Sequence, residues 1–244
     1  MPSRDLSGGR AGSVRRGASG LPWLVRRPGG QMIKRRRERE EQSGTDKATA
    51  DPSTTQDGDA SGLSPRPQGP WDGAEVEVDD GRLDLGGLRI RGADGLQMQV
   101  QMNEQGGAVS LVTLNAADGA VQVQAFAAPR SNGIWRDVRA QLMASINASG
   151  GLVEEADGEF GVELRAKVPG AGGQLQPARF VGVDGPRWFL RGLFLGSAAT
   201  AGGGPALESA FRDIVVVRGE SAMAPGEALP LRLPDSAQAT RADT

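Results

Sequence analysis

The chain has 244 residues with 38% hydrophobic and 4% aromatic side chains, and 37 glycines and 15 prolines. This composition indicates that part of the sequence builds no core. Histidine, cysteine and tyrosine are absent, which excludes disulfides, zinc sites made from Cys or His, and catalytic triads that use His as the base. The formal net charge of −2 is unevenly distributed along the chain.

Residues 1–70 are predicted to form a disordered, charged arm. The first 37 residues carry ten basic side chains and one acidic side chain, and the basic segment ends in Lys34, Arg35, Arg36 and Arg37. A polar run without helical or strand periodicity follows as far as Pro70. The basic cluster could bind nucleic acid or an anionic membrane surface, but a solvated tail is the interpretation that charge runs usually favour.

Met32 is a second candidate for the start of the protein. The segment Met32–Arg37 has the character of a natural N-terminus, and residues 1–31 have the featureless composition of translated upstream sequence. An intact mass of the protein from its native host tests this hypothesis.

Alternation of apolar and polar residues dominates the predicted domain, residues 71–222. In residues 96–102 every second side chain is apolar and each one between is Gln. Such strands have one dry and one wet face, which is typical of an antiparallel sheet covered on one side. The strand candidates are residues 82–91, 96–102, 108–115, 121–125, 151–156, 162–168, 174–183 and 187–195.

Two helices are predicted among these strands. The first spans residues 133–148, where Ile134, Trp135, Val138, Leu142 and Ile146 form one apolar stripe. Asn132 is expected to cap its start and Gly150 its end.

The second predicted helix begins at Pro205, and Leu207, Ala210, Phe211 and Ile214 form its stripe. The predicted fold is therefore α+β, a single mainly antiparallel sheet in the order ββββαββββα with both helices on its dry face. Residues 223–244 are a Pro- and Ala-rich tail, of which residues 229–233 are expected to pack on the domain.

The most suggestive candidate surface lies on the predicted strand 187–195. Alternation places Arg187, Phe189 and Arg191 on its wet face, and the neighbouring strand and turn add Arg179 and Asp184. Two guanidinium groups around a ring could bind phosphate, carboxylate or a nucleobase. The alternative, which we favour, is that the arginine stems cover apolar sheet surface and pair with Glu163 or Asp184.

Other candidate chemistry is weaker. The acidic residues Glu154, Glu155, Asp157, Glu159 and Asp184 could supply paired carboxylates or a magnesium site, although turns favour acids for local reasons. Two glycine-rich loops lack the residues of nucleotide-binding motifs. We therefore expect no cofactor, no metal and no catalytic residue. No apolar run is long enough to span a membrane, and a cytoplasmic location is expected.

Three segments carry a resemblance to a known family. They are residues 124–135, residues 180–192 with the run Phe-Val-Gly-Val-Asp-Gly-Pro-Arg-Trp-Phe-Leu-Arg-Gly, and residues 211–219. With residues 69–72 and 223–225 as flanks, they resemble the uncharacterised actinobacterial family known as domain of unknown function 3710. The resemblance implies a cytoplasmic actinobacterial protein, and it implies no reaction, ligand or active site.

Three functions follow as hypotheses. The first is a non-catalytic binding or adaptor domain that contacts another protein. The second is association with nucleic acid through the basic arm, which the acidic character of the domain opposes. The third is a carboxylate- or metal-dependent enzyme, which requires a cleft that gathers several of the acids named above.

Overall fold

The structure is a computed structural model that describes residues 66–77, 81–102, 109–117, 119–130, 133–170, 172–200 and 202–233. The basic cluster Lys34–Arg37, the candidate start Met32 and nearly all of the predicted arm lie outside these residues. The last eleven residues of the predicted tail also lie outside them.

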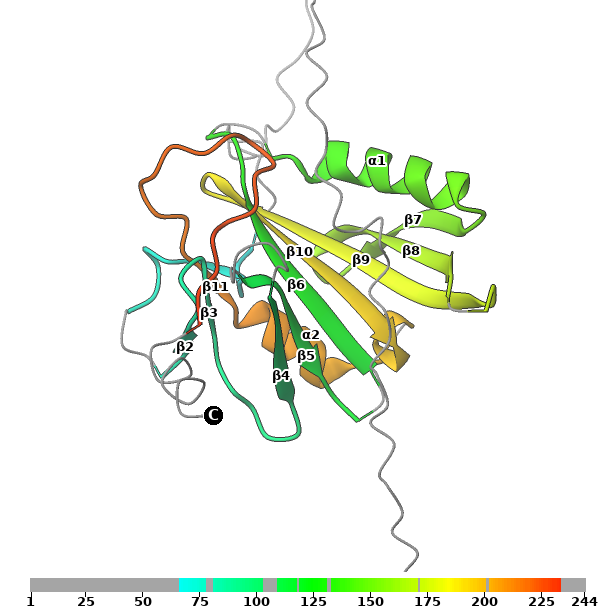
Figure 1. The fold of residues 1–244 in the computed structure, drawn as a ribbon, viewed down its shortest axis with the longest axis horizontal. Helices are drawn as coiled ribbons and strands as arrows, with labels where there is room; N and C mark the ends of the chain where they lie inside the picture. Colours follow the sequence, from blue (N-terminus) through cyan, green and yellow to red (C-terminus); the bar gives the residue numbers. More distant parts are fainter. Residues whose placement is uncertain are drawn as a thin grey trace, which may run out of the picture.

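A seven-stranded antiparallel sheet forms the centre of the molecule, in the order β4-β5-β6-β10-β9-β8-β7 (Figure 1). Its strands are β4 (Gln97–Met102), β5 (Val109–Asn115), β6 (Gly119–Ala127), β7 (Leu152–Gly158), β8 (Gly161–Pro169), β9 (Leu175–Gly185) and β10 (Trp188–Gly196). The predicted α+β class and its mainly antiparallel pairing are confirmed.

A second, four-stranded sheet corrects the prediction of a single sheet. Its strands are β1 (Trp71–Asp72), β2 (Leu83–Asp84), β3 (Leu88–Ile90) and β11 (Val215–Val216), in the order β1-β11-β3-β2. The two-residue strand β1 is too short to show alternation, so the sequence pattern did not indicate it.

The predicted strand over residues 82–91 is in fact the hairpin β2–β3. The Asp84 carboxylate accepts a hydrogen bond of 2.7 Å from the Gly86 backbone N–H, and Gly86 has a φ of +82°. This local turn folds the segment back on itself. With β1 and β11 added, the element order is longer than the predicted ββββαββββα.

The two helices, α1 (Trp135–Ala148) and α2 (Pro205–Arg212), pack on opposite faces of the large sheet. The prediction that both lie on one face is wrong. On β10, Phe189 and Leu193 pack with Trp135 of α1, whereas Phe194 packs with Phe211 of α2. The helix α1 contacts β7, β8 and β9, and α2 lies behind β6 in the view of Figure 1.

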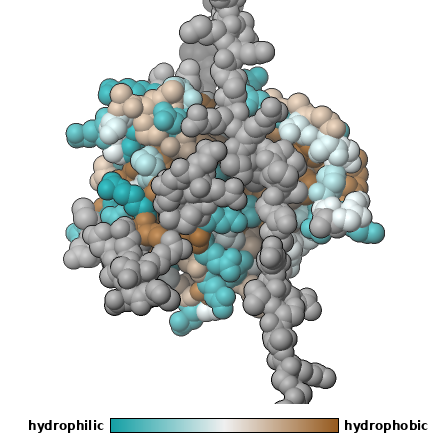
Figure 2. Space-filling view, viewed as in Figure 1, coloured by the Kyte–Doolittle hydropathy of each residue, from teal (hydrophilic) through white to brown (hydrophobic). Residues whose placement is uncertain are grey.

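The central strands are therefore buried on both faces rather than on one. In β10 six of the nine residues are buried. Single-sided alternation survives at the end of the sheet that α1 does not cover, where Gln97, Gln99 and Gln101 of β4 are exposed. Figure 2 shows hydrophilic side chains over this part of the sheet.

The small sheet and the chain that follows β11 complete the core around α2. Leu88 of β3 is fully buried in this core together with Leu229 and Leu231, which are 4% and 5% exposed. Leu231 forms a bridge with Gly86. No helix among the described residues is long and apolar enough to cross a membrane.

Candidate functional site

The candidate site is an open pocket where the small sheet meets the turn between β9 and β10. It has a volume of about 430 Å³. The turn is held against the small sheet by the Trp188 indole N–H, which donates a hydrogen bond of 2.6 Å to the carboxylate of Asp72 on β1. The pocket is lined by Asp72, Gly73, Ala74, Asp84, Arg89, Pro186, Arg187, Val217, Arg218 and Gly219.

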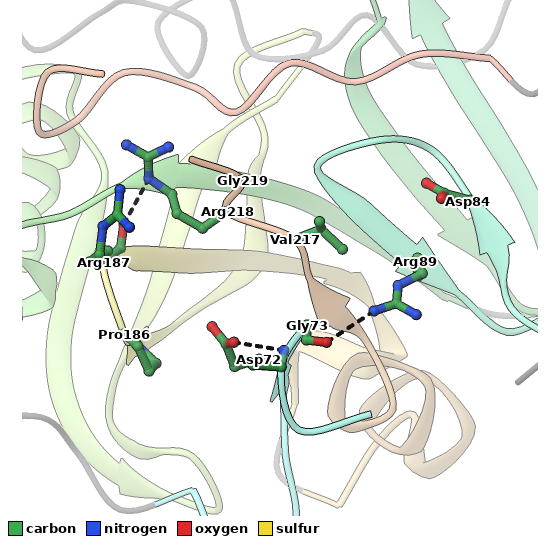
Figure 3. Close-up of a pocket in the computed structure, with 10 residues that line it drawn as sticks. Asp72, Gly73, Asp84, Arg89, Pro186, Arg187, Val217, Arg218 and Gly219 are labelled. Carbon is green, nitrogen blue, oxygen red and sulfur yellow. Dashed lines mark hydrogen bonds between the residues drawn. The ribbon is translucent and has the colours of Figure 1, made fainter. Parts of the chain in front are cut away.

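Two arginines dominate one end of the pocket. Arg187 occupies the β9–β10 turn, and Arg218 follows β11. In Figure 3 their guanidinium groups lie side by side, with Arg89 and Asp84 at the other end. The Arg218 Nε group donates to the Arg187 backbone carbonyl at 3.1 Å, and its Nη1 group donates to the Ser221 carbonyl at 3.1 Å. These bonds to neutral groups orient the Arg218 side chain and leave its charge unneutralised.

Arg187 has a left-handed backbone conformation, with a φ of 64°. A turn with Pro at its second position and a positive φ at its third usually has Gly or Asn there. Among the described residues, Arg187 is the one residue other than glycine with a positive φ. A side chain costs about 1 kcal/mol in this conformation, so the turn would be more stable with glycine.

The two acids of the pocket are engaged by neutral donors. Asp72 accepts from the Trp188 indole and from the Ala74 backbone N–H at 2.9 Å, and Asp84 accepts from Gly86. Arg89, which is 4% exposed, donates to the carbonyls of Glu77 and Gly73 at 3.0 and 3.3 Å. Neither acid forms an ion pair with Arg187 or Arg218.

The structure separates the five residues of the predicted binding surface, and only Arg187 lies in the pocket. Arg179 projects from β9 on the opposite face of the sheet from Phe189. There it pairs with Glu208 of α2, lies 3.8 Å from Glu163, and stacks 4.4 Å above the Phe194 ring centroid. For Arg179, pairing with Glu163 is the arrangement that the alternative interpretation described.

Asp184 caps helix α1 from a distant strand. Its carboxylate accepts hydrogen bonds from the backbone N–H groups of Ile134 at 2.8 Å and Trp135 at 3.2 Å. Burial raises the pKa of Asp184, and these two bonds and the charge of Arg139 lower it by less. The predicted cap, Asn132, lies outside the described residues, whereas Gly150 ends the helix with a φ of +79° as expected.

Phe189 is buried and Arg191 is half-buried, so neither lies on a solvent-exposed face. Phe189 is 1% exposed and stacks between Phe126 and Trp135, at centroid distances of 5.9 and 5.7 Å. Arg191 bonds to Gln124 and lies 5.4 Å from the Phe126 ring centroid, and burial lowers its pKa to about 10. The prediction that Phe189 lies on a wet face is wrong because Trp135 of α1 covers it, which alternation within one strand does not reveal. Arg191 is half-buried against Gln124 and Phe126 of β6.

The candidate acids are not gathered into one cleft. Glu155 pairs with Arg139 of α1 at 3.2 Å, and Glu159 pairs with Arg212 at the end of α2. Within the described part of the chain, no group of three or more acids is arranged to hold a metal ion.

Sequence reasoning missed Arg218, Arg89 and Asp72 as pocket residues. Asp72 and Arg89 lie in short strands of the small sheet and Arg218 follows another, and periodicity does not detect strands of this length. A signal was nevertheless present, because Arg187 and Arg218 lie in two of the segments that carry the family resemblance and Asp72 lies in a flank of it.

The fold defines an α+β protein in which a large and a small sheet share a core, with an arginine-lined pocket where they meet. The chain belongs to the family described as protein of unknown function (DUF3710), whose model matches residues 69–240. No curated protein matches it. Among solved structures it is similar to the solution structure of cyanobacterial PsbP (CyanoP) from Synechocystis sp. PCC 6803, with 14% identity, 50% of this chain and 84% of that chain covered, and a TM-score of 0.32.

Proposed function

We propose that this chain is a non-catalytic binding domain that acts as an adaptor through contacts with another protein, in the cytoplasm of an actinobacterium. The observation that carries the proposal is the pocket, where Arg187 and Arg218 present adjacent guanidinium groups that form no ion pair with a carboxylate of the described residues. Arginine is enriched among the residues that dominate binding energy at protein interfaces.

The chemistry of the pocket favours binding over catalysis. Its side chains are those of Arg, Asp, Val, Pro and Ala, with no hydroxyl, amine or thiol nucleophile among them. A general base needs access to a substrate proton, whereas Asp72 and Asp84 already accept hydrogen bonds from neighbouring groups. The enzyme hypothesis is therefore the weakest of the three.

The test is affinity purification of the tagged full chain from its native host, with and without nuclease, followed by mass spectrometry. The double variant Arg187→Gly/Arg218→Gln removes the paired charges of the pocket. Arg136→Gln removes one exposed charge from α1, away from the pocket, and serves as the control.

A stoichiometric protein that survives nuclease, persists with the control and is lost with the double variant supports the proposal. Partners that disappear with nuclease would instead favour nucleic-acid association through Lys34–Arg37. A partner that binds wild type and double variant equally would show that the pocket is not the contact surface.

A further inference from the structure

The Arg187–Arg218 pair has hydrogen-bond donors that are free to bind a ligand. Arginine has five N–H donors in a planar fork. Arg218 uses its Nε group and one Nη1 donor on the carbonyls of Arg187 and Ser221. These two bonds fix the guanidinium plane, and the remaining donors have no partner among the described residues.

The pocket also holds an unrelieved charge repulsion. Arg187 and Arg218 lie beside each other (Figure 3), and the carboxylates of Asp72 and Asp84 are bonded elsewhere. Two like charges side by side raise the free energy of the pocket, and a bound anion lowers it. The left-handed φ of Arg187 places a guanidinium in a turn that glycine would occupy with less strain.

The charge and shape of the pocket select among anions. Its lining has three arginines and two aspartates, a formal charge of +1. That balance matches a singly charged anion better than a dianionic phosphate, which the two aspartates repel. A planar carboxylate also fits the guanidinium fork by two parallel hydrogen bonds.

We infer that the Arg187–Arg218 pair binds a side-chain carboxylate from an acidic segment of a partner protein. The inference rests on the proposed function and adds the chemistry of the partner. The pocket is open and holds about 430 Å³, so it accepts the end of a side chain while the rest of the partner lies across the rim.

The experiment is an NMR titration of the isotope-labelled full chain with a blocked tetraglutamate peptide. The matched probes are the blocked tetraglutamine peptide and inorganic phosphate. The glutamate peptide should shift the NMR signals of the backbone amides of Val217, Arg218 and Gly219, and the glutamine peptide should not. Raising the salt concentration should weaken this binding.

Two variants localise the effect. Loss of one charged hydrogen-bonding partner should weaken binding by about tenfold in Arg218→Gln and in Arg187→Gly. The second variant relieves backbone strain, so its weaker binding cannot be attributed to unfolding. Arg136→Gln should bind as wild type.

Three results overturn the inference: no shift at the pocket, equal shifts with the glutamine peptide, or tighter binding of phosphate than of the glutamate peptide. If any of these occurs while the purified partner still depends on Arg187 and Arg218, the adaptor proposal stands and only the carboxylate chemistry fails. If the glutamate peptide binds but no partner is captured, the proposed function fails and the ligand chemistry stands.

Discussion

Arg187 lowers the stability of its turn but places a positive charge in the pocket. Its backbone conformation suits glycine, and its side chain supplies half of the charged pair in the pocket. Strained backbone conformations of this kind persist where the surrounding structure imposes them, and they gather at functional sites.

Arg187→Gly should therefore stabilise the protein by about 0.5–1 kcal/mol, because the relief of steric strain at positive φ exceeds the entropic cost of ordering glycine and the lost side-chain contacts. Urea unfolding followed by tryptophan fluorescence measures the difference. Arg187→Ala keeps the strain and should show no such gain. A destabilised Arg187→Gly variant would mean that the side chain contributes to folding.

Asp184 has a structural role, although the sequence made it a candidate for a binding surface or a magnesium site. It replaces a local cap by accepting hydrogen bonds from Ile134 and Trp135 across 50 and 49 residues of sequence, respectively. Asp184→Ala should cost about 1–2 kcal/mol, and Asp184→Asn should cost less because it keeps one acceptor oxygen. Equal losses in the two variants, measured by urea unfolding, would show that the charge rather than the acceptor matters.

The raised pKa of Asp184 gives a pH dependence of definite sign. Burial raises it above the ordinary value of 3.8, so the folded state binds the proton more tightly than the unfolded state. This contribution to stability is complete below the ordinary value and is lost as the pH rises through the folded value. The stability of wild type relative to Asp184→Asn should therefore increase between pH 7 and pH 4. A constant or falling difference would contradict the assigned shift.

At the scale of elements, two glycines allow the helices to approach the sheet. A Cβ atom at Gly182 would lie 2.2 Å from the Trp135 ring of α1, and one at Gly192 would lie 2.7 Å from the Phe211 ring of α2. Each aromatic ring thus fills the space that a side chain on the sheet would occupy. The two glycines serve opposite faces, so they set the two helix positions independently.

Gly182→Ala and Gly192→Ala should each destabilise the protein by about 1–3 kcal/mol, because the added methyl group displaces a buried ring. Gly92→Ala is the matched control, since a Cβ atom there meets nothing within 4 Å. Thermal unfolding should show a fall in Tm of several degrees for the first two variants and little change for the third. Equal Tm values for all three would mean that the helices shift freely.

At the scale of the whole molecule, β10 joins two cores into one cooperative unit. Phe189 and Leu193 belong to the core under α1, whereas Trp188, Leu190 and Phe194 belong to the core shared by α2 and the small sheet. Each core would expose buried side chains if β10 left it, so we expect both cores to unfold together.

Leu231→Ala tests whether the two cores unfold together, because Leu231 packs with the small sheet and not with α1. Loss of this buried side chain should cost about 2–4 kcal/mol, and hydrogen exchange should show the same loss at amides of α1 as at amides of β3. Leu152→Ala is the matched control because Leu152 is 60% exposed. A loss confined to β3 would show that the small sheet opens separately.

The sequence predicted the elements better than their assembly. Alternation and helical spacing located all seven strands of the large sheet and both helices, because these patterns are local. The sequence did not reveal that α1 and α2 lie on opposite faces of the large sheet. Strand β10 is apolar on both faces, and the alternation in it placed Phe189 and Arg191 on a face expected to meet solvent. The pocket was missed for a related reason: Asp72, Arg187 and Arg218 meet through tertiary contacts of two-residue strands.

The edge of the large sheet carries a further consequence. Strand β7 is the last in the order, and its Glu154, Glu155 and Asp157 are exposed. An unpaired strand edge is a template on which another chain can add, and like charges along it repel a second copy of the same edge. The carboxylates of β7 therefore oppose the growth of the molecule, edge to edge, into a longer sheet.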